Sequence, residues 1–306
     1  MVEIIYQRQV TPPESITWQT KLSQLEGIQV VGSHSVDGWK SPSAADVITE
    51  DAKQTIFEDS IGGLKKFFTS SDLPLPNDDI LDRLRILGKE DYLVASVLIK
   101  SADPGKSLGV SLTGRLAVVN ADKIFEASQE AGTNFGDLMC VVGTHEIVHT
   151  LTYQESWRRN VGTVRNIDSH TRRDGIYSSR PPEYIPFDPE IGFPPISPPD
   201  TRRDALNYFS EGLVQYVTES SLPERLLPTF KKVDPYAQNL KCIKLFMDRL
   251  GDEPFIDAAF NKHGFRHLYL AFEEEYGEGG FNNILKTIRN GNQEEVLSRL
   301  VDKGFL

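Results

Sequence analysis

The chain has 306 residues, of which 39% are apolar and 25% charged, which is the composition of an ordinary globular protein. Its net charge of −11 argues against a nucleic-acid partner, because binding to phosphates requires a basic face. The two cysteines, Cys140 and Cys242, are too few for a disulfide framework and form no Cys-x-x-Cys metal motif.

The start of the chain lacks the features of a secretory signal. The first ten residues contain no basic segment followed by an apolar stretch, and no window of eighteen apolar residues occurs anywhere. This pattern predicts a cytoplasmic protein without a membrane partner, with export by a leaderless route left open.

The first part of the chain, residues 1–80, has a mixed α/β pattern. Residues 27–32 are typical of a short buried strand, and residues 45–68 of a helix that Gly62 and Gly63 interrupt. We interpret this part as either a substrate lobe or an inhibitory prosegment.

The next part is the most strand-like. Runs rich in valine, leucine and isoleucine are separated by turn residues, and they comprise residues 83–87, 92–99, 108–112 and 115–120. The short connections favour antiparallel hairpins in a small mixed or antiparallel sheet. We expect the last strand, from Arg115 to Asn120, to lie at the edge of this sheet.

A long helix should follow, capped by Asn134 and running to Trp157 or Arg158. Together with the strands it would form a catalytic part, residues 81–160. Residues 161–204 are predicted to be a loop, because eight prolines between Pro181 and Pro199 exclude a helix interior.

The remaining chain, residues 205–306, has the pattern of an all-helical C-terminal lobe. Its predicted helices are residues 205–219, 235–250, 254–262, 265–276, 281–289 and 294–301. The fold class expected from these elements is α+β.

The central helix carries the sequence His-Glu-Ile-Val-His. Histidines at positions i and i+4 lie one turn apart on the same helix face, so His145 and His149 can bind one metal ion. Glu146 follows the first histidine and can act as a general base toward the attacking water. No other charge occurs between Gly143 and Tyr153, which predicts a buried helix. The alternative is a pair of core histidines satisfied by hydrogen bonds.

A third metal ligand is needed, and two carboxylates are candidates. Thr152 and Glu155 stand where one zincin group continues as HExxHxxGxxH, but threonine lacks the freedom of glycine to bend the chain, so Glu155 is a minor alternative. Glu211 is the only carboxylate between Ala205 and Thr218. A lone buried carboxylate costs several kcal/mol unless it is paired or binds a metal. The alternative for Glu211 is a surface position on an amphipathic helix.

Residues 145–151 and 207–218 resemble the gluzincin metallopeptidases, in which HExxH is followed by a downstream glutamate ligand in an EG-x-x-x-Y segment. The resemblance covers about twenty positions by motif and roughly the second half of the chain by the order of its parts. It implies a zincin-like fold and a Zn²⁺ ion bound by His145, His149 and Glu211. The chain departs from the thermolysin-like pattern in its long proline-rich loop, and in Gln215, which stands where those enzymes have an aspartate.

The same resemblance implies a zinc metallopeptidase that hydrolyses peptide bonds with Glu146 as the general base. Tyr208 and Tyr236 are candidate donors to the oxyanion. In zincins the strand before the active helix binds an extended peptide, so we expect a peptide or protein substrate along the strand from Arg115 to Asn120. Two alternatives stay open: a catalytically silent zincin-fold binding or regulatory protein, and a zinc hydrolase of a non-peptide amide.

Overall fold

The computed structural model describes residues 43–75, 80–98, 107–112, 116–160, 168–174, 176–178, 203–261 and 264–289. These residues form two compact units that do not follow the order of the chain. The α5 unit contains the described residues up to Leu151 together with Val217–Asp234. The aromatic unit contains those in Thr152–Tyr216 and those from Pro235 on. The predicted strand at 27–32 and the predicted helix at 294–301 lie outside the described residues.

The sheet of the α5 unit has three strands in the order β1-β3-β2. β1 (Leu84–Leu87) is parallel to β3 (Leu116–Asn120), and β2 (Gly109–Leu112) is antiparallel to it. The predicted mixed sheet is therefore confirmed, but the prediction that the strand from Arg115 to Asn120 lies at the edge is wrong. All five residues of β3 are buried, as expected for a central strand whose first four residues are apolar. The edges of this sheet are β1 and β2.

A helix replaces one of the predicted strands. Residues 92–99 were expected to be extended, whereas α3 spans Lys89–Leu98. A short apolar run does not distinguish strand from helix, and the start of α3 is determined by a distant residue. The Asp122 carboxylate accepts a hydrogen bond from the Lys89 backbone N–H at 2.7 Å. Glu90 and Asp91 in the first turn add a favourable interaction with the helix dipole.

Asp122 itself lies in the first turn of α4 (Ala121–Ala131), a helix that the sequence pattern did not reveal. Its carboxylate also accepts hydrogen bonds from the backbone of Ala44 at 2.6 Å and from the Ser43 hydroxyl at 3.0 Å. One carboxylate thus joins α4 to α3 and to the short helix η1 (Ala44–Val47).

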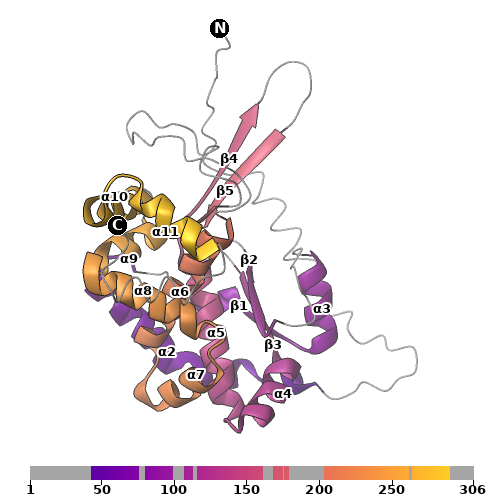
Figure 1. The fold of residues 1–306 in the computed structure, drawn as a ribbon. Helices are drawn as coiled ribbons and strands as arrows, with labels where there is room; N and C mark the ends of the chain where they lie inside the picture. Colours follow the sequence, from indigo (N-terminus) through magenta and orange to yellow (C-terminus); the bar gives the residue numbers. More distant parts are fainter. Residues whose placement is uncertain are drawn as a thin grey trace. The chain divides into compact units, whose positions relative to one another are not determined.

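Helix α5 (Phe135–Leu151) is the centre of its unit. The helices α2 (Glu50–Ser70), α4 and α7 (Leu227–Val233) and the strands β2 and β3 pack against it (Figure 1). As predicted, the side chain of Asn134 caps its start, accepting a hydrogen bond from the Asp137 N–H at 3.1 Å.

The predicted end of α5 at Trp157 or Arg158 is wrong. The helix stops at Leu151, and residues Gln154–Asn160 form strand β4. The Arg83 guanidinium donates to the Thr150 carbonyl at 3.1 Å, which satisfies one of the acceptors exposed at a helix end.

Helix α2 is also continuous, whereas an interruption at Gly62 and Gly63 was expected. A Cβ atom at Gly63 would lie 1.9 Å from the carbonyl oxygen of Ser221, the last residue of α6 (Arg203–Ser221). Gly63 therefore provides the space in which the end of α6 packs on α2, within the α5 unit. A Cβ at Gly62 would meet nothing within 4 Å.

The aromatic unit begins with a β-hairpin. β4 pairs antiparallel with β5 (Asp168–Asp174), and β5 with β6 (Tyr177–Ser178). The predicted loop over residues 161–204 therefore contains two strands, β5 and β6. The sequence did not indicate them, because these residues are mostly polar and show no hydrophobic periodicity. The prolines between Pro181 and Pro199 lie outside the described residues.

Helices make up the rest of this unit and match the predicted ranges closely: α6, α8 (Ala237–Leu250), α9 (Glu253–Phe260), α10 (Gly264–Tyr276) and α11 (Gly280–Arg289). Their core is a group of edge-to-face aromatic rings that includes Phe209, Phe246, Phe272 and Phe281, with neighbouring ring centroids 5.0–6.0 Å apart. The described chain is mostly helical with a small mixed sheet, which confirms the α+β class. None of the described helices is long and apolar enough to cross a membrane.

Two adjacent glycines of α2 provide a matched test of this packing. Gly63→Ala is expected to lower the free energy of unfolding by about 1–3 kcal/mol, because its Cβ would push α6 away from α2. Gly62→Ala should instead raise it by about 0.5–1 kcal/mol through better helix propensity. Chemical denaturation of both variants measures the difference, and equal effects would contradict the close contact.

Candidate metal centre

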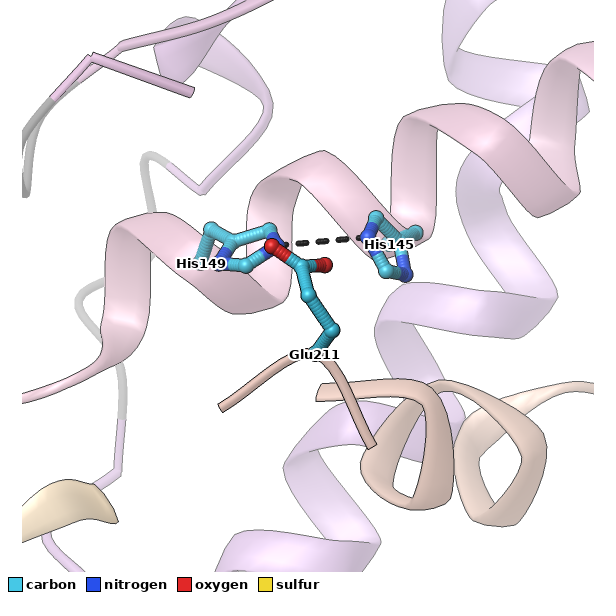
Figure 2. A group of neighbouring side chains, drawn as sticks. All are labelled: His145, His149 and Glu211. Atoms are coloured by element: carbon cyan, nitrogen blue, oxygen red, sulfur yellow. Dashed lines mark hydrogen bonds between the residues drawn. The ribbon is translucent and has the colours of Figure 1, made fainter. Parts of the chain in front are cut away.

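His145 and His149 lie one turn apart on α5 and approach each other closely. Their Nε2 atoms are 3.2 Å apart, and the rings are nearly perpendicular, with centroids 4.9 Å apart and an interplanar angle of 77°. His145 is buried, with 8% of its surface exposed. As the sequence spacing predicted, the two side chains lie on the same face of α5 and their Nε2 atoms are close together (Figure 2).

Glu211 on α6 is the third member of this group. One ligand atom from each of His145, His149 and Glu211 can be chosen so that all three lie within 4.8 Å of one another. Figure 2 shows the Glu211 carboxylate directed toward the two rings. Among the described residues, this is the group of histidine, cysteine and acidic side chains that could hold a metal ion.

Helix α6 is continuous and carries Glu211 near its middle. The last residues of the helix, from Val217 to Ser221, belong to the α5 unit, where Ser221 packs against Gly63. Glu211 thus lies on the same continuous helix as Ser221, ten residues before it.

The geometry of the two nitrogens fits a tetrahedral metal. Two nitrogen ligands bound to zinc at 2.0–2.1 Å lie about 3.3 Å apart, close to the 3.2 Å between the Nε2 atoms of His145 and His149. Two imidazoles and one carboxylate also form a recognised set of ligands for a divalent cation that keeps one coordination position open. The three residues therefore fit a metal ion.

Glu146 is buried beside this group, with 8% of its surface exposed. A Cβ atom at Gly109, the first residue of β2, would lie 2.7 Å from Glu146 Cγ and 2.8 Å from Oε1. The edge strand therefore begins directly against the Glu146 side chain. Because position 109 has no side chain, the carboxylate has the space that it occupies.

The surroundings of Glu211 argue against a surface position. A Cβ atom at Gly212 would lie 2.6 Å from Ile243 Cγ1 and 2.7 Å from the Asn239 carbonyl oxygen, so α6 packs closely on α8 at this point. The residues that follow are buried, and Gln215, one turn after Glu211, is only 3% exposed. Gly212 is therefore a packing residue, and Glu211 itself is half-buried beside it.

Of the two candidate oxyanion donors, Tyr208 has its hydroxyl in the aromatic unit next to the Cys242 thiol. Burial, followed by the interaction with Cys242, raises the pKa of Tyr208, and burial raises the pKa of the Cys242 thiol to about 12. Among the described residues the Tyr208 hydroxyl has no hydrogen-bond partner with good geometry. These contacts favour a packing role for Tyr208.

Tyr236 lies immediately before the first residue of α8, as predicted, and its role as a donor stays a prediction. The minor alternative ligand, Glu155, lies in strand β4 rather than on the helix where it was expected. The helix cannot carry it because α5 ends at Leu151.

Sequence reasoning missed Tyr92, Ser107 and Gly109, which lie near Glu146. The Tyr92 side chain is fully buried, and its hydroxyl is 2.8 Å from the Ser107 hydroxyl oxygen. The pKa of Tyr92 is raised to about 12, mainly by burial. The hydrogen bond with Ser107 lowers this pKa, and the negative charge of Glu146 raises it further. No local pattern connects these residues with Glu146, because they meet only through the packing of α3 and β2 near α5.

The chain was also compared with known proteins. No family model matches it, and neither a curated protein nor a solved structure does. The candidate metal centre therefore rests on the motif of α5 and on the geometry of His145, His149 and Glu211.

Proposed function

We propose that the protein is a zinc-dependent metallopeptidase in which His145, His149 and Glu211 bind Zn²⁺. The observation that carries this proposal is the convergence of two helical histidines and one carboxylate from a separate helix beside the buried Glu146. A mixed sheet, an HExxH helix and a later glutamate helix, in this order along the chain, support a zincin-like fold.

Zinc is favoured over other divalent cations by the ligand set. Magnesium and calcium prefer an environment made entirely of oxygen atoms, whereas zinc binds imidazole nitrogen and carboxylate oxygen in tetrahedral geometry. Three protein ligands leave one position open, which is the arrangement of catalytic rather than structural zinc sites.

When bound, zinc supplies Lewis acidity, which polarises a carbonyl oxygen and acidifies water. Glu146 accepts the proton of the attacking water on its carboxylate and delivers it to the leaving amine. Its burial against Gly109 limits the positions that the carboxylate can adopt and reduces its contact with bulk solvent. Tyr236 is retained as the proposed oxyanion donor.

The substrate proposed for this site is an extended peptide bound along β2. In the described sheet β2 pairs with β3 on one side only, so its other side offers backbone groups for strand addition. The first residue of β2 lies against Glu146, so a peptide bound on this edge would lie close to the proposed general base. β2 thus takes the role first expected of the strand from Arg115 to Asn120.

The metal centre is tested by zinc binding. The wild-type protein is expected to bind one zinc ion, and His149→Ala or Glu211→Gln should weaken binding at least 100-fold, because each removes one of three ligands. Matched controls are His267→Ala, on α10, and Glu219→Gln, two turns beyond Glu211 on α6, and both should bind zinc normally. Calorimetry and elemental analysis measure binding, and a wild-type protein without stoichiometric zinc would refute the site.

The chemistry is tested with a peptide library. Glu146→Gln keeps the shape of the side chain but cannot accept a proton, so cleavage should fall by about 10²–10⁴-fold while zinc content is unchanged. If this variant cleaves as well as the wild type, Glu146 is not the base. If zinc is bound but neither protein cleaves any peptide, a binding protein or a hydrolase of non-peptide amides becomes the better proposal.

Gly109→Ala tests the contact between β2 and Glu146. The added methyl group would displace the carboxylate, so kcat should fall roughly 10-fold or more, as expected when a catalytic group moves by about 1 Å. Zinc binding should be retained, because the atoms nearest to the added methyl group belong to Glu146 and not to a metal ligand. Gly62→Ala, the same substitution on α2, is the control and should keep full activity, because nothing lies within 4 Å of its added Cβ. Equal kcat values for the two variants would rule out the contact.

A further inference from the structure

Tyr92 joins two elements that are separate in the chain. It lies on α3, its ring is fully buried, and its hydroxyl shares a hydrogen bond of 2.8 Å with Ser107, two residues before β2. A buried tyrosine usually finds a partner for its hydroxyl, and here this partner belongs to the segment that leads into the edge strand.

The start of β2 is held by a second hydrogen bond. The backbone N–H of Asn120, at the end of β3, donates to the Leu108 carbonyl at 2.8 Å. Ser107 is thus held by the Tyr92 side chain of α3, and Leu108 is held by the backbone of the central strand β3. The next residue is Gly109, which lies against Glu146.

These contacts form a continuous path from Tyr92 to the general base. We propose that Tyr92 is a positioning residue: its hydrogen bond to Ser107 holds the start of β2 in the place where this edge binds the main chain of a peptide beside Glu146. This inference rests on the proposed peptidase function. The Tyr92 phenol, whose pKa burial raises to about 12, is protonated at neutral pH, and it can donate or accept in this bond.

The kinetic test uses Tyr92→Phe, which removes the hydroxyl and keeps the ring. With a peptide that the wild type cleaves, KM should rise about five-fold, the typical effect of losing one hydrogen bond, while kcat changes less than two-fold. A purely structural role would lower the amount of active enzyme, and hence the apparent kcat, without changing KM. An unchanged KM would therefore overturn the proposal.

Ser107→Ala removes the same bond from the other side and should raise KM by the same factor. The double variant should then resemble either single variant, because the bond can be lost only once. If the KM increase of the double variant equals the product of the two single increases, the residues act independently, and this result would overturn the proposal. If Tyr92→Phe does not fold, Ser107→Ala alone carries the comparison, since Ser107 is only partly buried.

Hydrogen exchange gives a readout that does not depend on peptidase activity. Amide exchange within β2 (Gly109–Leu112) should become at least five-fold faster in both single variants, while exchange in α5 stays unchanged. Tyr276→Phe, at a buried tyrosine of the aromatic unit, is the control and should leave β2 unaffected. Unchanged exchange in β2 would show that the bond does not hold the strand. If exchange is faster in the variants but the wild type cleaves no peptide, only the proposed function is refuted.

Discussion

The burial of helix α5 is the constraint on which the rest of the structure depends. Its polar residues His145 and Glu146 lie in a densely packed interior, where an unpaired polar group costs several kcal/mol. Each therefore needs a specific environment. The Nε2 atoms of His145 and His149 are 3.2 Å apart, and the carboxylate of Glu211 on α6 lies close to them. Glu146 occupies the space left by Gly109 of β2.

Close approach of backbones makes this arrangement possible. Helix α6 packs on α2 through Gly63 and on α8 through Gly212, so a side chain at either glycine would push the helix out of place. Glu211 directly precedes Gly212 and lies ten residues before Ser221, which contacts Gly63. Each of the two glycines thus allows one part of α6 to pack closely within its own unit.

The sheet contributes to the site through its edge. β1 pairs with β3 on one side and β2 pairs with it on the other, and the first residue of β2 lies against Glu146. Tyr92 and Asn120 fix the approach to this strand by hydrogen bonds. The buried Glu146 carboxylate and an edge strand of the sheet are therefore parts of one packed assembly in the α5 unit.

The sequence by itself determined the features that depend on local spacing. The shared face of His145 and His149, the cap at Asn134 and most of the later helices follow from helical periodicity, which needs only neighbouring residues. Glu211 could be inferred because it is the only carboxylate between Ala205 and Thr218, among residues that are mostly apolar or neutral, and a buried carboxylate needs a partner.

Only the tertiary structure decided which elements meet. The order of the strands, the helical state of residues 89–98, the end of α5 at Leu151 and the contacts of Gly109 and Tyr92 all depend on residues far apart in the chain. The physical reason is that short apolar runs are compatible with strand or helix, and long-range pairing selects between the two.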